Sequence, residues 1–108
     1  MKIKIGCKII SEHSKPYFIA DIAANHDGDI NRAYQLIALA KEAGADAAKF
    51  QNFKAKTNVS KNGFESIGSQ ISHQSSWKQS VFDTYKNASI PEEWSEKLKQ
   101  KCEEVGIE

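Results

Sequence analysis

The stretch Ala45–Gln51, which reads Ala-Asp-Ala-Ala-Lys-Phe-Gln, decides the predicted fold of this 108-residue chain. It follows a helical segment that stops at Gly44, so we interpret it as a buried strand ending in a lysine and a glutamine. A lysine is out of place inside a buried strand, but at the carboxyl end of the strand it can face a cleft. In parallel α/β sheets, ligands bind at that end. We therefore expect Lys49 and Gln51 to face an anionic substrate.

A strand and a helix precede this stretch. Tyr17–Ile22 is a continuous apolar run with one carboxylate, and its aromatic and β-branched content favours a buried parallel strand. Asp29 is the expected N-cap of the next helix, and Gly44 is its expected C′ residue. Strand, helix and strand with short joints predict a βαβ unit. The apolar stripe of the helix falls on Ile30, Ala33, Ile37 and Ala40.

The first residues and the last helix complete the pattern. Residues 1–10 alternate between apolar and lysine side chains, which predicts a β-hairpin with its second strand near Lys8–Ser11, followed by a connector to residue 16. Ser89–Glu92 fits a capping box for a helix that Gly106 ends. The expected buried stripe of that helix is Trp94, Leu98, Cys102 and Val105.

Between these parts the pattern breaks after Gln51. Asn52–Ser76 is polar, and a loop of this length is either functional or a misread element. Trp77, Val81 and Tyr85 are spaced by four, which predicts a helix in the second half, with disorder of the whole stretch as the alternative. The final Val105–Glu108 repeats the glycine-then-strand pattern seen after the first helix, so we expect a fragment of a longer chain.

Composition excludes several classes of function. The net charge is +1 and basic residues are scattered, so nothing indicates a nucleic-acid interface. Apolar runs are too short to cross a bilayer, and lysines interrupt the first ten residues, which argues against a signal peptide. Cys7 and Cys102 lie far apart, in no metal-like or redox-like spacing, and are expected to be unpaired thiols in a reducing cytoplasm.

Polar residues gather where the predicted strands end. Asp21, Asn25 and His26 follow the first strand, and Lys49 and Gln51 end the second. Parallel pairing would bring the two groups together, and a lysine beside a carboxylate can bind a phosphate or carboxylate. The alternatives are a lysine that merely reaches solvent, an aspartate that caps the following turn, and a structural histidine. Residue spacing alone indicates a phosphate- or acid-binding β/α fragment, without naming a reaction.

Two motifs extend this interpretation. Phe18–Asp29, which includes Ala-Ala-Asn-His-Asp-Gly, resembles the first strand and loop of the sialic acid synthase family. Ala38–Gln51 is similar to the second-strand motif of that family, whose members make N-acetylneuraminate, legionaminate and pseudaminate. The resemblance implies an α/β fold, the N-terminal portion of a (β/α)8 TIM barrel preceded by a short β-hairpin. Residues 1–16 would be the capping hairpin and connector, and residues 17–108 the first two β/α units with a long excursion.

The resemblance also implies a reaction, the condensation of phosphoenolpyruvate with an N-acylated hexose to form a nonulosonic acid with release of phosphate. By family match, Lys49 binds phosphoenolpyruvate, Gln51 contacts the sugar side, and Asp21 is catalytic, lying near the metal and the substrates. Asn25 and His26 match a turn that shapes the site and are predicted as substrate-binding. Position 21 is more often glutamate in the family, so Asp21 reaches one methylene less far.

Other expectations concern what lies around this site. The resemblance implies a divalent metal, Mn²⁺ or Mg²⁺, whose ligands lie outside this chain, and a full-length enzyme that is a cytoplasmic homodimer. We expect the chain alone to be inactive, because two β/α units cannot close an eight-stranded barrel. The alternatives are another phosphoenolpyruvate-condensing aldolase, acting on a phosphorylated sugar, and a non-catalytic barrel piece that serves in assembly or binding.

Overall fold

The fold was analysed in a computed structural model. The structure describes residues 1–52, 83–84, 86 and 89–108. The predictions for the long excursion from residue 53 onward, with Trp77, Val81 and Tyr85, lie outside the described residues.

A βαβ unit forms the centre of the molecule, as the sequence predicts. Strand β3 (Ile19–Ala23) leads through helix α1 (Ile30–Glu42) to strand β4 (Ala47–Phe50), and the two strands pair in parallel. Asp29 caps α1, since its side chain accepts a hydrogen bond from the backbone N–H of Asn31. At the other end Gly44 takes a φ of 93°, which glycine adopts without steric cost. Both predicted helix boundaries are confirmed.

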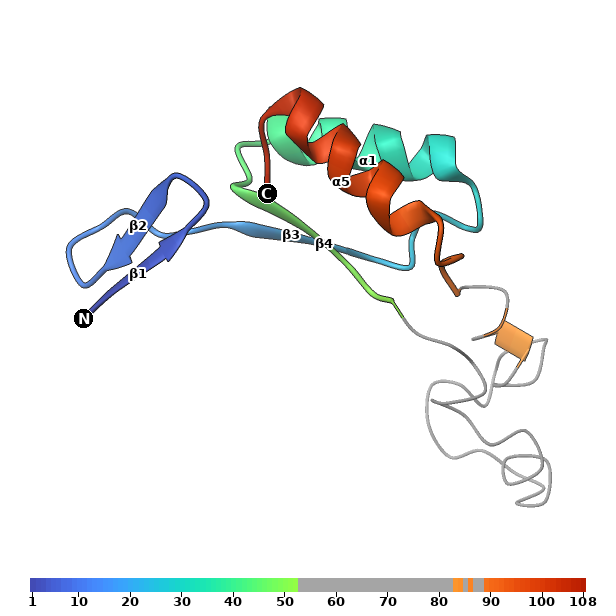
Figure 1. Cartoon of the computed structure of the whole chain (residues 1–108), viewed down its shortest axis with the longest axis horizontal. Helices are drawn as coiled ribbons and strands as arrows, with labels where there is room; N and C mark the ends of the chain where they lie inside the picture. The colour runs from blue at the N-terminus through green and yellow to red at the C-terminus, as the bar shows by residue number, and fades with distance from the viewer. Residues whose placement is uncertain (53–82, 85, 87–88) are drawn as a thin grey trace, which may run out of the picture.

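Helix α5 (Trp94–Val105) packs against α1, and the core lies between the two helices and one face of the sheet (Figure 1). The predicted stripes of both helices are confirmed, because every third or fourth residue turns inward. At the far end of the pair, the ammonium group of Lys41 donates to the carbonyl oxygen of Gly106 at 3.2 Å. The buried stripe residues are Ala33, Ile37, Ala40, Trp94, Leu98 and Cys102.

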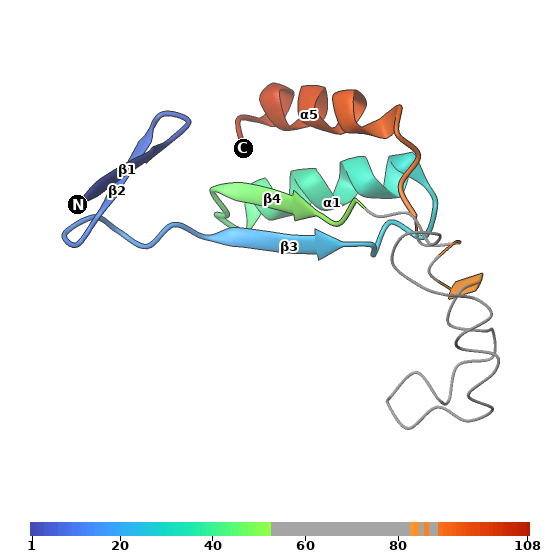
Figure 2. The ribbon, with the colours of Figure 1, turned by 60° about the horizontal axis from the view of Figure 1, so that its bottom comes forward.

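Both helices lie on the same side of the β3–β4 pair (Figure 2). Among the described residues the opposite face of the pair is bare, and Ile19, which points to that face, is 57% exposed. The prediction of a strand buried on both faces at Tyr17–Ile22 is therefore wrong for the described part of the chain. The strand has one covered face, marked by Ile22, and one face, which carries Ile19 and Asp21, that no described residue covers.

The start of α5 also differs from the prediction. Ser89–Glu92 does not open the α-helix, which begins at Trp94 with Glu93 as an N-cap that makes no side-chain capping bond. The residues before it form tight turns, in which Trp94 and Ser95 donate to carbonyl groups three residues back. Pro91 fits into this turn, but the turn does not continue directly as α-helix. The predicted C-terminus of the helix is confirmed, because Gly106 has a φ of 80°.

The predicted hairpin is confirmed and lies beyond the amino-terminal end of the parallel strands (Figure 1). Strands β1 (Lys2–Ile5) and β2 (Lys8–Ser11) pair antiparallel around a turn in which Gly6 has a φ of 55°. Lys8 forms an ion pair with Asp46, just before β4. This pair ties the hairpin to the sheet.

Glu108 pairs with the start of β4 as a residue of a third parallel strand would. The N–H of Glu108 donates to the carbonyl of Asp46 at 3.1 Å, and the N–H of Ala48 donates to the carbonyl of Glu108 at 2.8 Å. These two bonds are the evenly slanted pattern of parallel pairing. In the described part of the chain, no helix has the length and apolar character needed to cross a membrane.

Candidate functional site

Asp21 and Lys49 occupy partner positions on the two parallel strands. Their neighbours Ile22 and Ala48 pack toward the helices, so alternation turns Asp21 and Lys49 to the bare face of the sheet. Oδ2 of Asp21 lies 3.9 Å from Nζ of Lys49, and the two side chains are 62% and 64% exposed. The alternative in which Asp21 caps the following turn is therefore wrong. The structure brings together the predicted carboxylate and the predicted anion-binding lysine.

A β-bulge follows this pair at the carboxyl end of β3. Asp21 pairs with Lys49, but Ala23 pairs with Phe50, so two steps along β3 correspond to one along β4. Ala23 takes a φ of 51°, which is uncommon and strained for a residue with a side chain. Gln51 continues the pairing, since its N–H donates to the carbonyl of Ala23 at 3.2 Å. Gln51 is exposed at the same end of the sheet as the Asp21–Lys49 pair.

Asn25 shapes the loop that follows β3. Its backbone N–H and its Nδ2 both donate to the carbonyl of Ile22, at 3.0 and 2.9 Å. Its own carbonyl accepts from Nε of Arg32 at 2.7 Å, and the same nitrogen lies 3.6 Å from the carboxylate of Asp27. These contacts fix the backbone of the turn. The predicted role of Asn25 in shaping the site agrees with them, and its contact with substrate stays a prediction.

His26 lies away from the bare face, in the layer beneath the helices. Its side chain has no exposed surface, and its ring meets the ring of Trp94 edge-on, with centroids 5.2 Å apart. Nδ1 accepts a hydrogen bond from the N–H of Gly28 at 3.0 Å, so the neutral ring carries its proton on Nε2. Burial lowers the pKa of His26, and the charge of Asp27 acts in the opposite direction. Because its ring is buried, His26 is connected to the Asp21–Lys49 pair only through the backbone of the loop after β3.

The described residues do not form a metal site on their own. Among them, no group of three histidine, cysteine, aspartate or glutamate side chains converges on one point. Asp21 offers one carboxylate on the bare face, whereas His26, the nearest histidine in the sequence, is buried on the other side of the sheet. Divalent cations such as Mn²⁺ need several oxygen or nitrogen ligands. The residues described here therefore do not supply a complete ligand set for such a cation.

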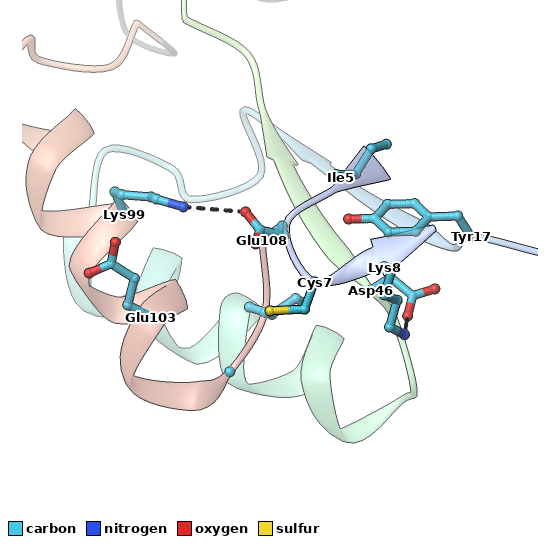
Figure 3. Close-up of a pocket in the computed structure, with 10 residues that line it drawn as sticks. Ile5, Cys7, Lys8, Tyr17, Asp46, Lys99, Glu103 and Glu108 are labelled. Atoms are coloured by element: carbon cyan, nitrogen blue, oxygen red, sulfur yellow. Dashed lines mark hydrogen bonds and ion pairs between the residues drawn. The ribbon is translucent and has the colours of Figure 1, made fainter. Parts of the chain in front are cut away.

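A hollow of about 370 Å³ lies at the opposite, amino-terminal end of the sheet (Figure 3). Lys8 points to Asp46 across one wall, and Lys99 points to Glu108 across another, at 3.4 Å. The hydroxyl of Tyr17 is buried beside them, and burial, followed by the charges of Glu108 and Asp46, raises its pKa. In β/α barrels this end serves stability more than catalysis.

Sequence reasoning missed this cluster because its members come from distant segments and show no common spacing. Asp46 lies within the stretch predicted as a strand, yet its Oδ2 accepts a hydrogen bond from the N–H of Phe18 at 2.8 Å. The bond from Lys8, and then the one from Phe18, lower the pKa of Asp46. Both cysteines are free, as predicted, with Cys7 exposed at the hairpin turn and Cys102 buried in the core.

Comparison with known proteins places the chain in a family. Residues 36–108 match the model of the NeuB family. The chain belongs to the NeuB family. It is similar to N,N'-diacetyllegionaminic acid synthase of Legionella pneumophila, with 53% identity over 45 residues that cover 42% of this chain and 13% of that protein. It is also similar to human N-acetylneuraminate-9-phosphate synthase, with 31% identity over 84% of this chain and 24% of that protein.

A solved structure shows the same arrangement of strands and helices. The N-acetylneuraminic acid synthetase of Leptospira borgpetersenii, determined in complex with citrate, matches 99% of this chain and 32% of its own chain, with a TM-score of 0.77 and 24% sequence identity. At this identity the match supports the fold alone. The NeuB-family chain described here spans about a quarter of the length of the curated relatives that match most of it. Its α/β fold corresponds to one part of the synthetase fold.

Proposed function

We propose that this chain forms the first part of a (β/α)8 barrel in a nonulosonic acid synthase. The enzyme would condense phosphoenolpyruvate with an N-acylated hexose and release phosphate. The observation that carries the proposal is the Asp21–Lys49 pair on the bare face of two parallel strands, near their carboxyl ends. Membership of the NeuB family and the names of its relatives, which include legionaminic and pseudaminic acid synthases, support this reaction class.

The barrel assignment rests on the way the sheet is covered. Helices α1 and α5 lie on one face, and Glu108 makes the two bonds that a residue of a third parallel strand beside β4 would make. In a closed barrel the other face turns inward, where side chains of neighbouring strands meet in layers. Ile19 would then lie in a lower layer, and Asp21 and Lys49 would lie above it at the mouth. Residues 1–16 would cover the base.

Lys49 would bind the phosphate or carboxylate of phosphoenolpyruvate as a compact positive charge. Its pairing with Asp21 is long, at 3.9 Å, and both side chains are well exposed, so a ligand can approach the ammonium without first breaking a tight ion pair. Asp21 would hold or accept a proton beside the reacting carbon atoms. Gln51, at the end of β4, would contact the sugar.

Further parts of the proposal concern the whole protein. A divalent metal, Mn²⁺ or Mg²⁺, would polarise the sugar aldehyde as a Lewis acid when bound, and its ligands would come from outside this chain. The enzyme would act in the cytoplasm as a homodimer.

The test is a kinetic comparison in the whole protein, with phosphoenolpyruvate and N-acetylmannosamine as substrates. Lys49→Ala removes a charged hydrogen-bond donor, which corresponds to a rise of about 10- to 100-fold in KM for phosphoenolpyruvate. The KM for the sugar should change much less. Lys4→Ala, on the exposed hairpin strand β1, is the matched control. An unchanged KM for phosphoenolpyruvate in Lys49→Ala would remove Lys49 from the site.

The isolated 108-residue chain gives a second test. Because its described residues supply one wall of the proposed site, it should release no phosphate from phosphoenolpyruvate in the presence of sugar and Mn²⁺. Sugar-dependent release by this chain alone would contradict the assignment of the remaining walls to other β/α units.

A further inference from the structure

His26 combines full burial with a polar atom that has no described partner. Nδ1 is used by the N–H of Gly28, at 3.0 Å. Nε2 is also buried, and among the residues that the structure describes it meets no hydrogen-bond partner. Burying a donor without a partner costs free energy, because the group loses its hydrogen bonds to water. A purely apolar side chain would fill the same space without that cost, so the histidine needs a reason to be there.

The reason lies in the loop that the ring holds. The ring bridges two elements, because it bonds to Gly28 in the loop after β3 and meets Trp94 at the start of α5 edge-on, with an interplanar angle of 70°. The carbonyl of His26 also accepts from the N–H of Asp29, the cap of α1. The loop is thereby attached to both helices at once.

The same loop contains two residues in the left-handed region. Ala23 has a φ of 51° and Asp27 a φ of 53°. Such conformations persist only where the surrounding structure holds them. Ala23 closes the bulge that follows Asp21, and His26 lies between the two strained positions. The seat of the ring and the bulge therefore belong to one short loop, which begins directly after the strand that carries Asp21.

We propose that His26 is a positioning residue whose ring, seated against Trp94 and bonded to the N–H of Gly28, holds the bulge at Ala23 and so places Asp21 beside Lys49. This inference rests on the proposed function for its kinetic consequence. Lys49 stands on β4, outside the loop, so binding of phosphoenolpyruvate through Lys49 should depend on the ring much less than the placement of Asp21 does. The proposal thus separates catalysis, which needs Asp21 in place, from binding of phosphoenolpyruvate.

The experiment uses His26→Asn in the whole protein, because the Asn side chain keeps an acceptor near the Nδ1 position and loses the ring. We expect kcat to fall at least tenfold, with a change in KM for phosphoenolpyruvate of less than threefold. Trp94→Phe, a milder change that keeps an aromatic ring, should lower kcat in the same direction. His13→Asn, an exposed histidine of the connector, should leave both constants unchanged. A rise in KM at unchanged kcat would overturn the proposal.

A rescue experiment tests the link to the bulge. Glycine adopts a positive φ without strain, so in the Ala23→Gly protein the bulge should keep its conformation without the His26 ring. We therefore compare the effects of His26→Asn with and without Ala23→Gly. In the Ala23→Gly protein, the fall in kcat and the fall in melting temperature caused by His26→Asn should each be at least threefold smaller than in the unsubstituted protein. Equal effects in the two backgrounds would show that His26 does not hold the bulge.

Two measurements on the seat of His26 need no substrate. The first is the comparison of melting temperatures among the single and double variants at positions 23 and 26, which form a double-mutant cycle. The second is the set of nitrogen chemical shifts of labelled histidine, which should show a proton on Nε2 and none on Nδ1. If the protein lacks synthase activity but shows this tautomer and a coupled cycle, the proposed function fails while the ring still holds the bulge. A proton on Nδ1 or an uncoupled cycle would refute the positioning role whatever the activity.

Discussion

The carboxylate of Asp21 lies 3.9 Å from the ammonium group of Lys49, at paired positions of two parallel strands. Both side chains are more than half exposed. Exposed pairs at this distance contribute little to stability, about 0–1 kcal/mol. The pair therefore contributes little to holding the fold together, and the proposed function assigns its two charges to the binding and reaction of a substrate.

This leads to a prediction in which activity and stability separate. Asp21→Asn keeps the shape of the side chain and removes its charge. We expect kcat of the whole enzyme to fall by about 100-fold, the usual scale for loss of a group that handles a proton. The free energy of unfolding should change by less than about 1 kcal/mol. Steady-state kinetics and urea unfolding of the same preparation measure both, and a large loss of stability with activity retained would mark the pair as structural.

A second prediction concerns the helix layer. Ile37 has no exposed surface, whereas Leu39, two residues further along the same helix, is 57% exposed. Ile37→Ala should lower the free energy of unfolding by about 2–5 kcal/mol, since it removes buried methyl groups and leaves a cavity. Leu39→Ala should cost less than about 1 kcal/mol and serves as the matched control. Similar losses in the two variants, measured by urea unfolding, would contradict the arrangement of α1 against α5.

The elements of the fold were predictable because their signals are local. The stripe of Ala33, Ile37 and Ala40 shows a period close to 3.6, and Asp29 and Gly44 are typical boundary residues at its two ends. The hairpin could be predicted from alternation in residues 1–10. Parallel pairing of the two central strands follows from the helix between them, and with it the meeting of Asp21 and Lys49.

The finer geometry of the site has no such local signal. Alanine rarely adopts a left-handed backbone conformation, so the bulge at Ala23 could not be predicted from residue type. The contact of His26 with Trp94 joins segments far apart in the chain, and His26 could equally have faced the ligand side. The apolar run that contains Phe18 and Ile19 suggested burial on both faces, although periodicity alone cannot say which face finds a cover.

Asp46 supports a third prediction, on acid stability. The hydrogen bond from Lys8, and then that from the N–H of Phe18, lower the pKa of Asp46 below its ordinary 3.8. A carboxylate with a lowered pKa in the folded state contributes stability above its unfolded pKa, and this contribution is lost as the pH falls through the folded value. Stability should therefore fall as the pH drops below about 4.

The variant Asp46→Asn cannot ionise, so it should be less stable than the unsubstituted protein at pH 7 and should lose less stability on acidification. Lys8→Met removes the main cause of the shift and should act in the same direction. Glu12→Gln, in the exposed connector, is the control. Urea unfolding between pH 7 and pH 2.5 measures these differences. An Asp46→Asn protein with the same pH dependence as the unsubstituted one would show that the Lys8 contact does not form in solution.

The burial of His26 leads to a prediction on how the free energy of unfolding depends on pH near neutrality. Burial lowers the pKa of His26 below its ordinary 6.5. As the pH falls below 6.5 the unfolded chain takes up the proton more readily than the folded one, so stability is complete above this pH and declines below it. For one group the slope is at most about 1.4 kcal/mol per pH unit. Once the pH lies below the folded pKa, the loss stops growing.

His26→Asn removes the titrating group, so the variant should be less stable at pH 7.5 and should have a shallower slope between pH 6.5 and pH 5. The difference in slope between the variant and the unsubstituted protein, measured by urea unfolding at half-unit intervals, isolates this residue. His13→Asn removes a histidine that is exposed and provides the comparison. A slope that His26→Asn leaves unchanged but His13→Asn flattens would contradict the burial of His26 against Trp94. If the His26 ring were accessible, it would take up its proton equally in the folded and unfolded states and would add nothing to the slope.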